Sequence, residues 1–178
     1  YQDTMRIISG THKGRRLMAP STLPVRPTTD RAKESLFNII QNRYYFEEKN
    51  MLDLYSGTGN IAYEFASRGC DKILAVDNNY NCINYIEETV NSLGFNIVTI
   101  KSDCLKYLKN CKQEFDFIFA DPPYDYDSYQ ELKNLIFENK LVKKGGLLII
   151  EHDKETQFEG DNLELRKYGT LQFSIFSF

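Results

Sequence analysis

Short apolar segments alternate with amphipathic segments along most of the chain after residue 50. Apolar runs that end in polar residues occur at 51–57, 72–79, 97–103, 115–123 and 147–153. Strands that are apolar on both faces and are separated by helices are typical of a mostly parallel sheet with right-handed crossovers. The pattern therefore predicts an α/β fold with helices on both faces of the sheet.

The intervals between these runs predict helices that end near Arg68 and Leu93, and a shorter helix after residue 103. The clearest helix follows Asp77, because its apolar positions are spaced three and four residues apart and Gly94 stands at its end. The final stretch, 169–178, is rich in strand-forming residues. We expect it to add antiparallel strands at an edge of the sheet.

The N-terminal part differs from this βα series. Residues 6–18 contain two short strand-prone runs around a glycine turn, which predicts a β-hairpin. After Pro20, Pro24 and Pro27, Thr29 or Asp30 can cap a helix that packs on the main sheet through apolar positions spaced by four: Ala32, Leu36, Ile40 and Tyr44. We therefore divide the chain into an extension, 5–49, and a core, 50–178.

Composition is consistent with one compact domain, since 42% of the 178 residues are hydrophobic. No apolar run is long enough to span a bilayer, and the start of the chain lacks the layout of a secretory signal. We expect a cytoplasmic protein without a membrane partner, and Met5 is a candidate natural start. The four cysteines form no CxxC pair, which argues against a metal site and favours reduced, mostly buried thiols.

Charge is unevenly distributed, although the whole chain carries only −3. Residues 5–33 hold seven basic residues against one acidic residue, Asp30, a net charge of +6. A basic patch on an acidic body suits a polyanion that binds at one place. The segment could equally be a solvated hairpin whose charges keep it soluble.

The turn after the first core strand, DLYSGTGNIA (53–62), has glycines at 57 and 59. Glycines there allow a sharp turn and a close approach to a ligand. Asp77 stands at the end of the next strand, where a carboxylate can accept hydrogen bonds from ribose hydroxyls. Both NAD and S-adenosylmethionine carry such a ribose, so this turn alone leaves the cofactor open.

The segment ADPPYD (120–125) follows a buried strand and therefore lies at the carboxyl edge of the sheet, where open α/β sheets bind ligands. Two prolines make the segment stiff, and they leave the Asp121 carboxylate and the Pro122 carbonyl as acceptors. Tyr124 adds a flat face on which a ring can stack. This combination favours a planar ring that carries an exocyclic amine.

The chain resembles the class I S-adenosylmethionine-dependent methyltransferases that contain a [DN]PP[FY] motif. Within them it is similar to the bacterial 16S rRNA guanine-N2 methyltransferase D family. The narrower likeness is carried by RIISGTHKGRRL, VRPTTDRAKESLFNII, DLYSGTGNIAYEFASRG and FADPPY. It implies a Rossmann-like fold with a seven-stranded sheet, S-adenosylmethionine as cofactor without a metal, and methyl transfer to a guanine N2 in small-subunit ribosomal RNA.

The resemblance also assigns residues to roles. Catalysis is assigned to Asp121, Pro122, Pro123 and Tyr124. The cofactor is assigned to Asp53, Tyr55, Ser56, Gly57, Gly59 and Asn60 at its methionine end, to Asp77 and Asn78 at the ribose, and to Asp103 and Cys104 at the adenine. Asp103 could alternatively cap the next helix. We expect Lys13, Arg15, Arg16 and Arg26 to contact RNA phosphates, and His152 to be structural.

Other readings stay open at this stage. The DPPY motif also occurs in adenine-N6 and protein glutamine-N5 methyltransferases, so the substrate assignment depends on the N-terminal segments. An NAD-dependent oxidoreductase would use the glycine turn but gives the DPPY segment no role. A non-catalytic RNA-binding module would keep the fold without turnover. We expect a monomer that acts on bare RNA or on an assembled ribosomal particle.

Overall fold

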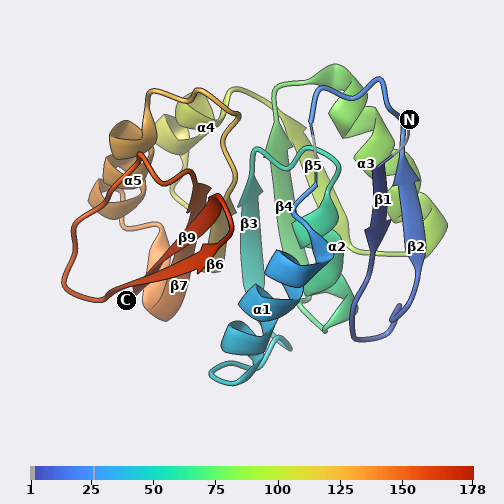
Figure 1. The fold of residues 1–178 in the computed structure, drawn as a ribbon, viewed down its shortest axis with the longest axis horizontal. Helices are drawn as coiled ribbons and strands as arrows, with labels where there is room; N and C mark the ends of the chain where they lie inside the picture. The colour runs from blue at the N-terminus through green and yellow to red at the C-terminus, as the bar shows by residue number, and fades with distance from the viewer. Residues whose placement is uncertain (1–2, 26) are drawn as a thin grey trace.

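The computed structural model describes residues 3–25 and 27–178, and its main sheet has seven strands. Their order is β5 (Ile97–Lys101), β4 (Lys72–Asp77), β3 (Asn50–Leu54), β6 (Phe115–Ala120), β7 (Val142–His152), β9 (Leu171–Ser177) and β8 (Leu163–Tyr168). The first five are parallel, whereas β9 is antiparallel to both of its neighbours (Figure 1). The predicted mostly parallel, seven-stranded sheet is confirmed.

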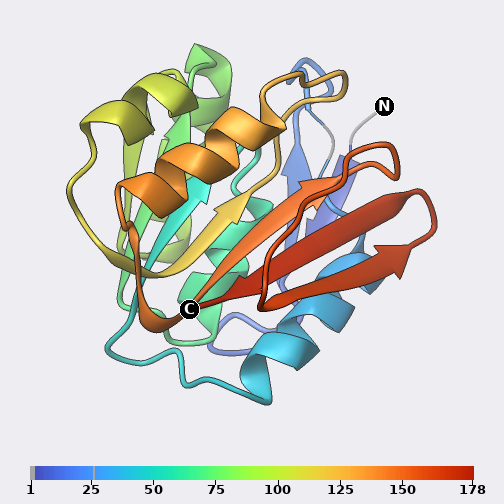
Figure 2. The same cartoon turned by 90° about the vertical axis from the view of Figure 1, so that its left-hand side faces the viewer.

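Helices cover both faces of this sheet: α1 (Asp30–Gln41), α2 (Asn60–Ser67), α3 (Tyr80–Leu93), α4 (Cys104–Asn110) and α5 (Tyr129–Glu138). Helices α1, α2 and α3 share one apolar cluster with alternate strand residues such as Met51 and Phe119. Helices α4 and α5 share a second cluster with the intervening residues, such as Leu52 and Ile118. Figure 2 shows α1 and α5 on opposite sides of the sheet. The strands are therefore buried on both faces, as their continuous apolar runs indicate.

The helix boundaries follow from capping residues. The Thr29 side chain accepts a hydrogen bond from the amide of Ala32, so Thr29 is the residue that caps α1. Helix α3 ends at Gly94, whose φ of 71° lies in the left-handed region. Helix α1 ends at Gln41, before Tyr44, which nevertheless packs on the core because the chain turns back there.

The N-terminal hairpin is confirmed, with strands β1 (Asp3–Arg6) and β2 (Arg16–Ala19) and a connection over 7–15. It packs on α3, where Met5, Ala19 and Leu23 surround the buried Cys82. Three of the four cysteines are buried, and all four are free thiols. The division of the chain at residues 49 and 50 stays a prediction, since α1 shares its core with the sheet.

One expectation about the C-terminal end is wrong. Strand β9 is antiparallel as predicted, but it lies inside the sheet between β7 and β8. Its five central residues are buried, as an interior position requires. The edge is β8, a strand that the sequence analysis did not identify, and its charged residues Glu164, Arg166 and Lys167 suit an exposed edge. None of the helices in the described part of the chain is long and apolar enough to cross a membrane.

Candidate functional site

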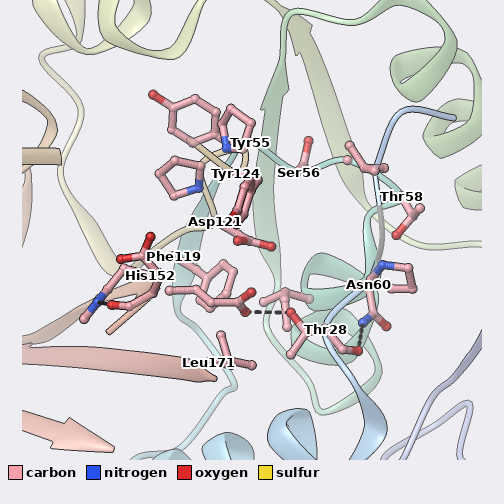
Figure 3. A pocket seen from close by; sticks show the side chains of 18 of the residues that line it. Thr28, Tyr55, Ser56, Thr58, Asn60, Phe119, Asp121, Tyr124, His152 and Leu171 are labelled. Atoms are coloured by element: carbon pink, nitrogen blue, oxygen red, sulfur yellow. Dashed lines mark hydrogen bonds between the residues drawn. The ribbon is translucent and has the colours of Figure 1, made fainter. Parts of the chain in front are cut away.

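The predicted glycine turn and the predicted DPPY segment lie on the wall of one cavity at the carboxyl edge of the sheet (Figure 3). The cavity has a volume of about 610 Å³. Nine predicted site residues line it: Asp53, Tyr55, Ser56, Gly57, Asn60, Asp121, Pro122, Pro123 and Tyr124. They come together because β3 and β6 are neighbouring parallel strands, whose carboxyl ends meet.

The turn between β3 and α2 has the sharp geometry that its glycines predict. Gly57 and Gly59 have φ values of 55° and 83°, which are strained for other residues. A Cβ atom on Gly59 would lie 2.5 Å from Cζ of the buried Tyr63 ring. Gly59, the residue that precedes α2, therefore leaves room for the Tyr63 ring of the same helix.

Asp53, near the end of β3, is a buried carboxylate with an unused acceptor. The side chain is only 2% exposed, and its Oδ2 has no hydrogen-bond partner among the described residues. Burial, and then the charge of Asp77, raises the pKa of Asp53 well above its usual range. A donor or a cation in the cavity would satisfy this oxygen.

Asp77, at the end of β4, holds the glycine turn in place from behind. Its Oδ2 accepts the amide hydrogen of Gly57 at 2.9 Å, and its Oδ1 accepts that of Asn79 at 2.9 Å. The neighbouring Asn78 is exposed. Asp77 and Asn78 are not among the residues that line the cavity, so their predicted contact with a ribose stays a prediction.

Cys104 and Asp103 lie beside the same turn. The Cys104 thiol is buried and accepts the amide hydrogen of Tyr55 at 3.3 Å, and burial raises its pKa to about 12. Asp103 caps α4 by accepting the amide hydrogen of Lys106 at 2.9 Å. The capping alternative is thus present in the structure, and the predicted adenine contact of both residues stays a prediction.

Asn60 lines the cavity, but its amide is engaged within the protein. Its Oδ1 accepts from the Lys33 ammonium at 2.8 Å, and its Nδ2 donates to the Thr28 carbonyl at 3.1 Å. Lys33 is fully buried and forms a salt bridge with Glu64, 3.2 Å away. Asn60 therefore joins the N-terminal segment to α1 and α2, and its predicted cofactor contact remains untested.

The DPPY segment leaves β6 and enters the cavity. The Asp121 amide donates to the Leu54 carbonyl at 3.3 Å, which ties the segment to the end of β3. Pro122 is buried, whereas Tyr124 is 88% exposed. The aromatic face that the sequence predicts next to these acceptors is therefore open to solvent.

Glu151 and Thr28 are among the polar residues of this cavity that sequence reasoning missed. Glu151 lies in β7 next to Asp121, because the preceding residues Ala120 and Ile150 are paired in register. The Thr28 hydroxyl donates to Glu151 Oε1 at 2.7 Å (Figure 3). The sequence did carry a signal for Glu151. It stands at the polar end of the apolar run 147–153, and open α/β sheets bind ligands at the carboxyl ends of their strands.

The Asp121 and Glu151 carboxyl groups follow paired residues of β6 and β7 and line the same cavity. Burial, and then the charge of Glu151, raises the pKa of Asp121 well above its usual range. Burial also raises the pKa of Glu151, but the hydrogen bond from Thr28 opposes that rise. These surroundings favour the proton on Asp121 and the negative charge on Glu151.

His152, the last residue of β7, lines the cavity, but its ring nitrogens are engaged within the protein. It is 4% exposed, and its ring nitrogens lie 2.6 Å from the Asp153 carbonyl and 2.7 Å from the Ser174 hydroxyl. Burial lowers its pKa. Within the described residues, no cluster of histidine, cysteine and acidic side chains could hold a metal ion.

The predicted RNA-contact residues Lys13, Arg15 and Arg16 lie away from the cavity. The loop that joins β1 to β2 contacts the ends of α2 and α3, through Thr11 to the Ser67 carbonyl and through His12 to the Leu93 carbonyl. These helix ends lie at the amino edge of the sheet, and Figure 1 shows this loop at the end of the molecule opposite to the tip of β3. Arg26 lies outside the described residues.

Comparison with known proteins shows relatives along almost the whole chain. The model of the family described as conserved hypothetical protein 95 matches residues 5–177. The Bacillus subtilis (strain 168) protein named "Putative rRNA methyltransferase YlbH" is 35% identical over 97% of this chain and 98% of its own. The Haemophilus influenzae protein "Ribosomal RNA small subunit methyltransferase D" is 29% identical over 85% of this chain and 80% of its own.

A solved structure shows the same fold at lower identity. It is the Thermus thermophilus 16S rRNA N2 methyltransferase RsmC in complex with AdoMet and guanosine, with a TM-score of 0.78 and 15% identity. The match covers 99% of this chain and 50% of that one. The fold is thus that of the class I methyltransferases. The chain belongs to the conserved hypothetical protein 95 family, which confirms the resemblance to methyltransferase D.

Proposed function

We propose that this protein transfers a methyl group from S-adenosylmethionine to the exocyclic N2 amine of a guanine in small-subunit ribosomal RNA. The observation that carries the proposal is the shared cavity: the buried Asp53 and the glycine turn face the same space as Asp121 and Pro122. Relatives named as ribosomal RNA methyltransferases support the reaction class. The N-terminal segments, which resemble methyltransferase D, favour guanine N2 over adenine N6 or glutamine N5.

The cavity residues fit the proposed cofactor. The unused Oδ2 of Asp53 suits the ammonium group at the methionine end, because a buried carboxylate needs a donor or a cation. The glycine turn would also bind the methionine end of the cofactor. Asp77 and Asn78 would bind the ribose, and Asp103 and Cys104 would bind the adenine. When bound, the cofactor supplies an electrophilic methyl group on a positively charged sulfur.

The electrostatics of the cavity favour the same ligand. Four acidic residues besides Asp121, whose raised pKa favours the neutral form, line it against one described basic residue, Lys154: Asp53, Glu151, Asp153 and Glu155. An acidic wall attracts a cofactor that carries a sulfonium and an ammonium. The product has lost the sulfonium charge, so this wall holds it less strongly. The lining therefore favours entry of the methyl donor and release of the product.

The amine is held by the DPPY segment. In guanine the N2 lone pair is delocalised into the ring, so the nitrogen is a weak nucleophile. Hydrogen bonds from N2 to the Asp121 carboxyl group and the Pro122 carbonyl orient the lone pair, and Tyr124 offers the exposed face on which the ring stacks. The base must leave its stack to reach this segment, and this costs least in a loop.

Incubation with labelled S-adenosylmethionine and small-subunit RNA, either bare or in assembled particles, tests the proposal. Mass mapping should find one methylated guanine, and parallel arms with DNA and protein should stay unlabelled. Label on adenine or on a protein glutamine would assign the enzyme to another substrate class. Sedimentation of the protein, and of its complex with particles, tests the expected monomer and the expected substrate.

Replacing Asp121 by alanine tests the role of the DPPY segment. We expect Asp121→Ala to lose at least about 100-fold in turnover, because it removes the acceptor that faces the amine. Its affinity for S-adenosylmethionine should stay within about twofold of wild type. Asp161→Ala, at an exposed position before β8, is the matched control and should keep wild-type turnover. Near-normal turnover in Asp121→Ala would remove Asp121 from the mechanism.

A further inference from the structure

We propose that Glu151 receives the proton that the methylated amine loses, through Asp121, and that Thr28 keeps Glu151 ready to accept it. The inference rests on the proposed function, because it needs an amine at Asp121. It identifies Glu151 as a positioning residue that acts through Asp121 and not on the base itself. The path runs from the cavity, across the ends of two neighbouring strands, to the N-terminal segment.

The two carboxyl groups are neighbours in the fold. Asp121 and Glu151 follow the register pair Ala120 and Ile150, so both side chains leave neighbouring strand ends on the same face of the sheet, and both line the cavity. Two like charges on neighbouring carboxyl groups disfavour each other, and burial together with the charge of Glu151 raises the pKa of Asp121. The pair therefore favours the state with one proton and a single negative charge.

The Thr28 hydroxyl decides where that charge lies. Thr28 is 8% exposed, and its hydroxyl donates to Glu151 Oε1 at 2.7 Å. A hydrogen bond to the ionised form of a carboxyl group stabilises that form. The negative charge is therefore assigned to Glu151, and the proton to Asp121.

The reaction releases one proton, which this pair can accept. The methylated nitrogen carries one proton more than the product, together with the positive charge that arrived with the methyl group. Its proton moves to the Asp121 oxygen that faces the base, while Asp121 passes its own proton from the other oxygen to Glu151. Asp121 ends protonated as it began, Glu151 ends neutral, and the product amine is neutral. Water restores the starting state after release.

Other charged groups around the pair do not offer a better acceptor. Asp53 on β3 has a raised pKa but lies on the cofactor side of the cavity, and His152 has both ring nitrogens engaged. The remaining titratable groups of the described cavity wall are three tyrosines and the charged residues after β7: Tyr55, Tyr124, Tyr129, Asp153, Lys154 and Glu155. Glu151 is the carboxyl group that follows the residue paired with Ala120, and it is therefore the direct neighbour of Asp121.

Glu151→Gln tests the acceptor, because the amide keeps the size of the side chain but cannot take the proton. We expect a loss of roughly 100-fold in kcat, with the Kd for S-adenosylmethionine and the KM for RNA within about twofold of wild type. In carboxyl-labelled, cofactor-free protein, Asp121 should titrate at lower pH than in wild type, because Glu151 raises its pKa. This titration needs no RNA and no turnover.

Thr28→Val and Thr28→Ser test the charge on Glu151. Activity requires ionised Glu151, so it falls as the pH drops through the Glu151 pKa. The Thr28 hydroxyl lowers this pKa, so Thr28→Val should move the acidic limb of the kcat profile to higher pH. Thr28→Ser keeps the hydroxyl and should keep the wild-type limb. A residue that only fills space would change kcat without moving the limb.

The outcomes separate this proposal from the proposed function. The proton path alone is overturned if the wild-type enzyme methylates guanine and Glu151→Gln is equally active. It is also overturned if the acidic limb of the kcat profile does not move in Thr28→Val. A wild-type enzyme that methylates no guanine overturns both. Three results together support the path. Glu151→Gln has a low kcat, Asp121 titrates at lower pH in that variant, and the acidic limb of the kcat profile moves to higher pH in Thr28→Val.

Discussion

Three carboxyl groups at the ends of neighbouring strands have different surroundings, and these give them different chemistry. Asp53 has an oxygen without a hydrogen-bond partner among the described residues, Asp121 lies beside a second carboxyl group, and Glu151 accepts a hydrogen bond from a hydroxyl. Desolvation raises all three pKa values, and the hydrogen bonds determine which group is ionised. The residue types alone would make these groups equivalent.

Asp53→Asn should weaken cofactor binding. The substitution removes the negative charge that we assign to the cofactor ammonium, and a hydrogen bond to a charged group contributes roughly 1.5–3 kcal/mol. We therefore expect the Kd for S-adenosylmethionine to rise about 10- to 100-fold, measured by calorimetry. An unchanged Kd would place the ammonium elsewhere.

The same variant predicts a pH dependence of stability. The folded-state pKa of Asp53 is raised, so its carboxyl group destabilises the folded protein at pH values above the unfolded-state pKa, and this cost shrinks as the pH falls from the folded pKa to the unfolded pKa. The free energy of unfolding of cofactor-free wild type, minus that of Asp53→Asn, should therefore rise as the pH is lowered from neutral. Urea unfolding over a pH series measures it, and a constant difference would contradict the raised pKa.

At the scale of elements, the site depends on where strands end and helices begin. The carboxyl ends of β3, β6 and β7 bring residues from three separate segments to one cavity. Between β3 and α2, the turn at Gly57 and Gly59 has left-handed backbone angles, and the missing side chain at Gly59 leaves room for the Tyr63 ring of α2. The turn therefore has a packing role as well as its proposed binding role.

Gly59→Ala should cost more stability than Gly94→Ala, although both glycines have positive φ. A Cβ on Gly94 meets nothing within 4 Å, so that variant bears only the backbone strain of about 1 kcal/mol. A Cβ on Gly59 would also meet the Tyr63 ring at 2.5 Å. Urea unfolding should show at least about 2 kcal/mol more destabilisation for Gly59→Ala. Equal losses would mean that the ring moves freely.

At the scale of the whole molecule, a buried ionic network joins the N-terminal segment to the helices beside the cavity. Glu64 accepts the amide hydrogens of Ile8 and Ser9 and forms salt bridges with Lys33 and Arg68. Burial lowers the pKa of Lys33 despite the nearby Glu64. The network therefore holds the extension and the core together at a cost in desolvation.

Lys33→Met should destabilise the protein by about 3–5 kcal/mol, because it removes one partner of a buried ion pair and leaves the Asn60 oxygen without its donor. The matched control is Arg43→Met, which removes the half-exposed ion pair with Glu164 and should cost less than about 1 kcal/mol. Thermal unfolding of both variants provides the comparison. Equal losses would show that burial of the Lys33 pair adds nothing.

The position of the basic loop predicts how substrate size affects binding. Lys13, Arg15 and Arg16 lie at the amino edge of the sheet, opposite to the cavity, so a short RNA at the cavity does not reach them. Reversing these charges should reduce both the affinity and the salt dependence for long RNA or particles, and leave a short stem-loop unaffected. Titrations at several salt concentrations test this. Unchanged binding to every RNA would leave the segment as a solvated hairpin.

The sequence by itself determined the parallel part of the sheet, the start of α1, the ends of α2 and α3, and the two halves of the cavity. Those features depend on local periodicity and on capping residues such as Thr29. They also depend on parallel strands having their carboxyl ends at one edge of the sheet, which places Asp53 and Asp121 together. Tertiary structure alone decided that β9 lies inside the sheet, that Glu151 and Thr28 meet Asp121, and that the basic loop lies at the far end. Each of these depends on pairing between distant segments, which local pattern does not encode.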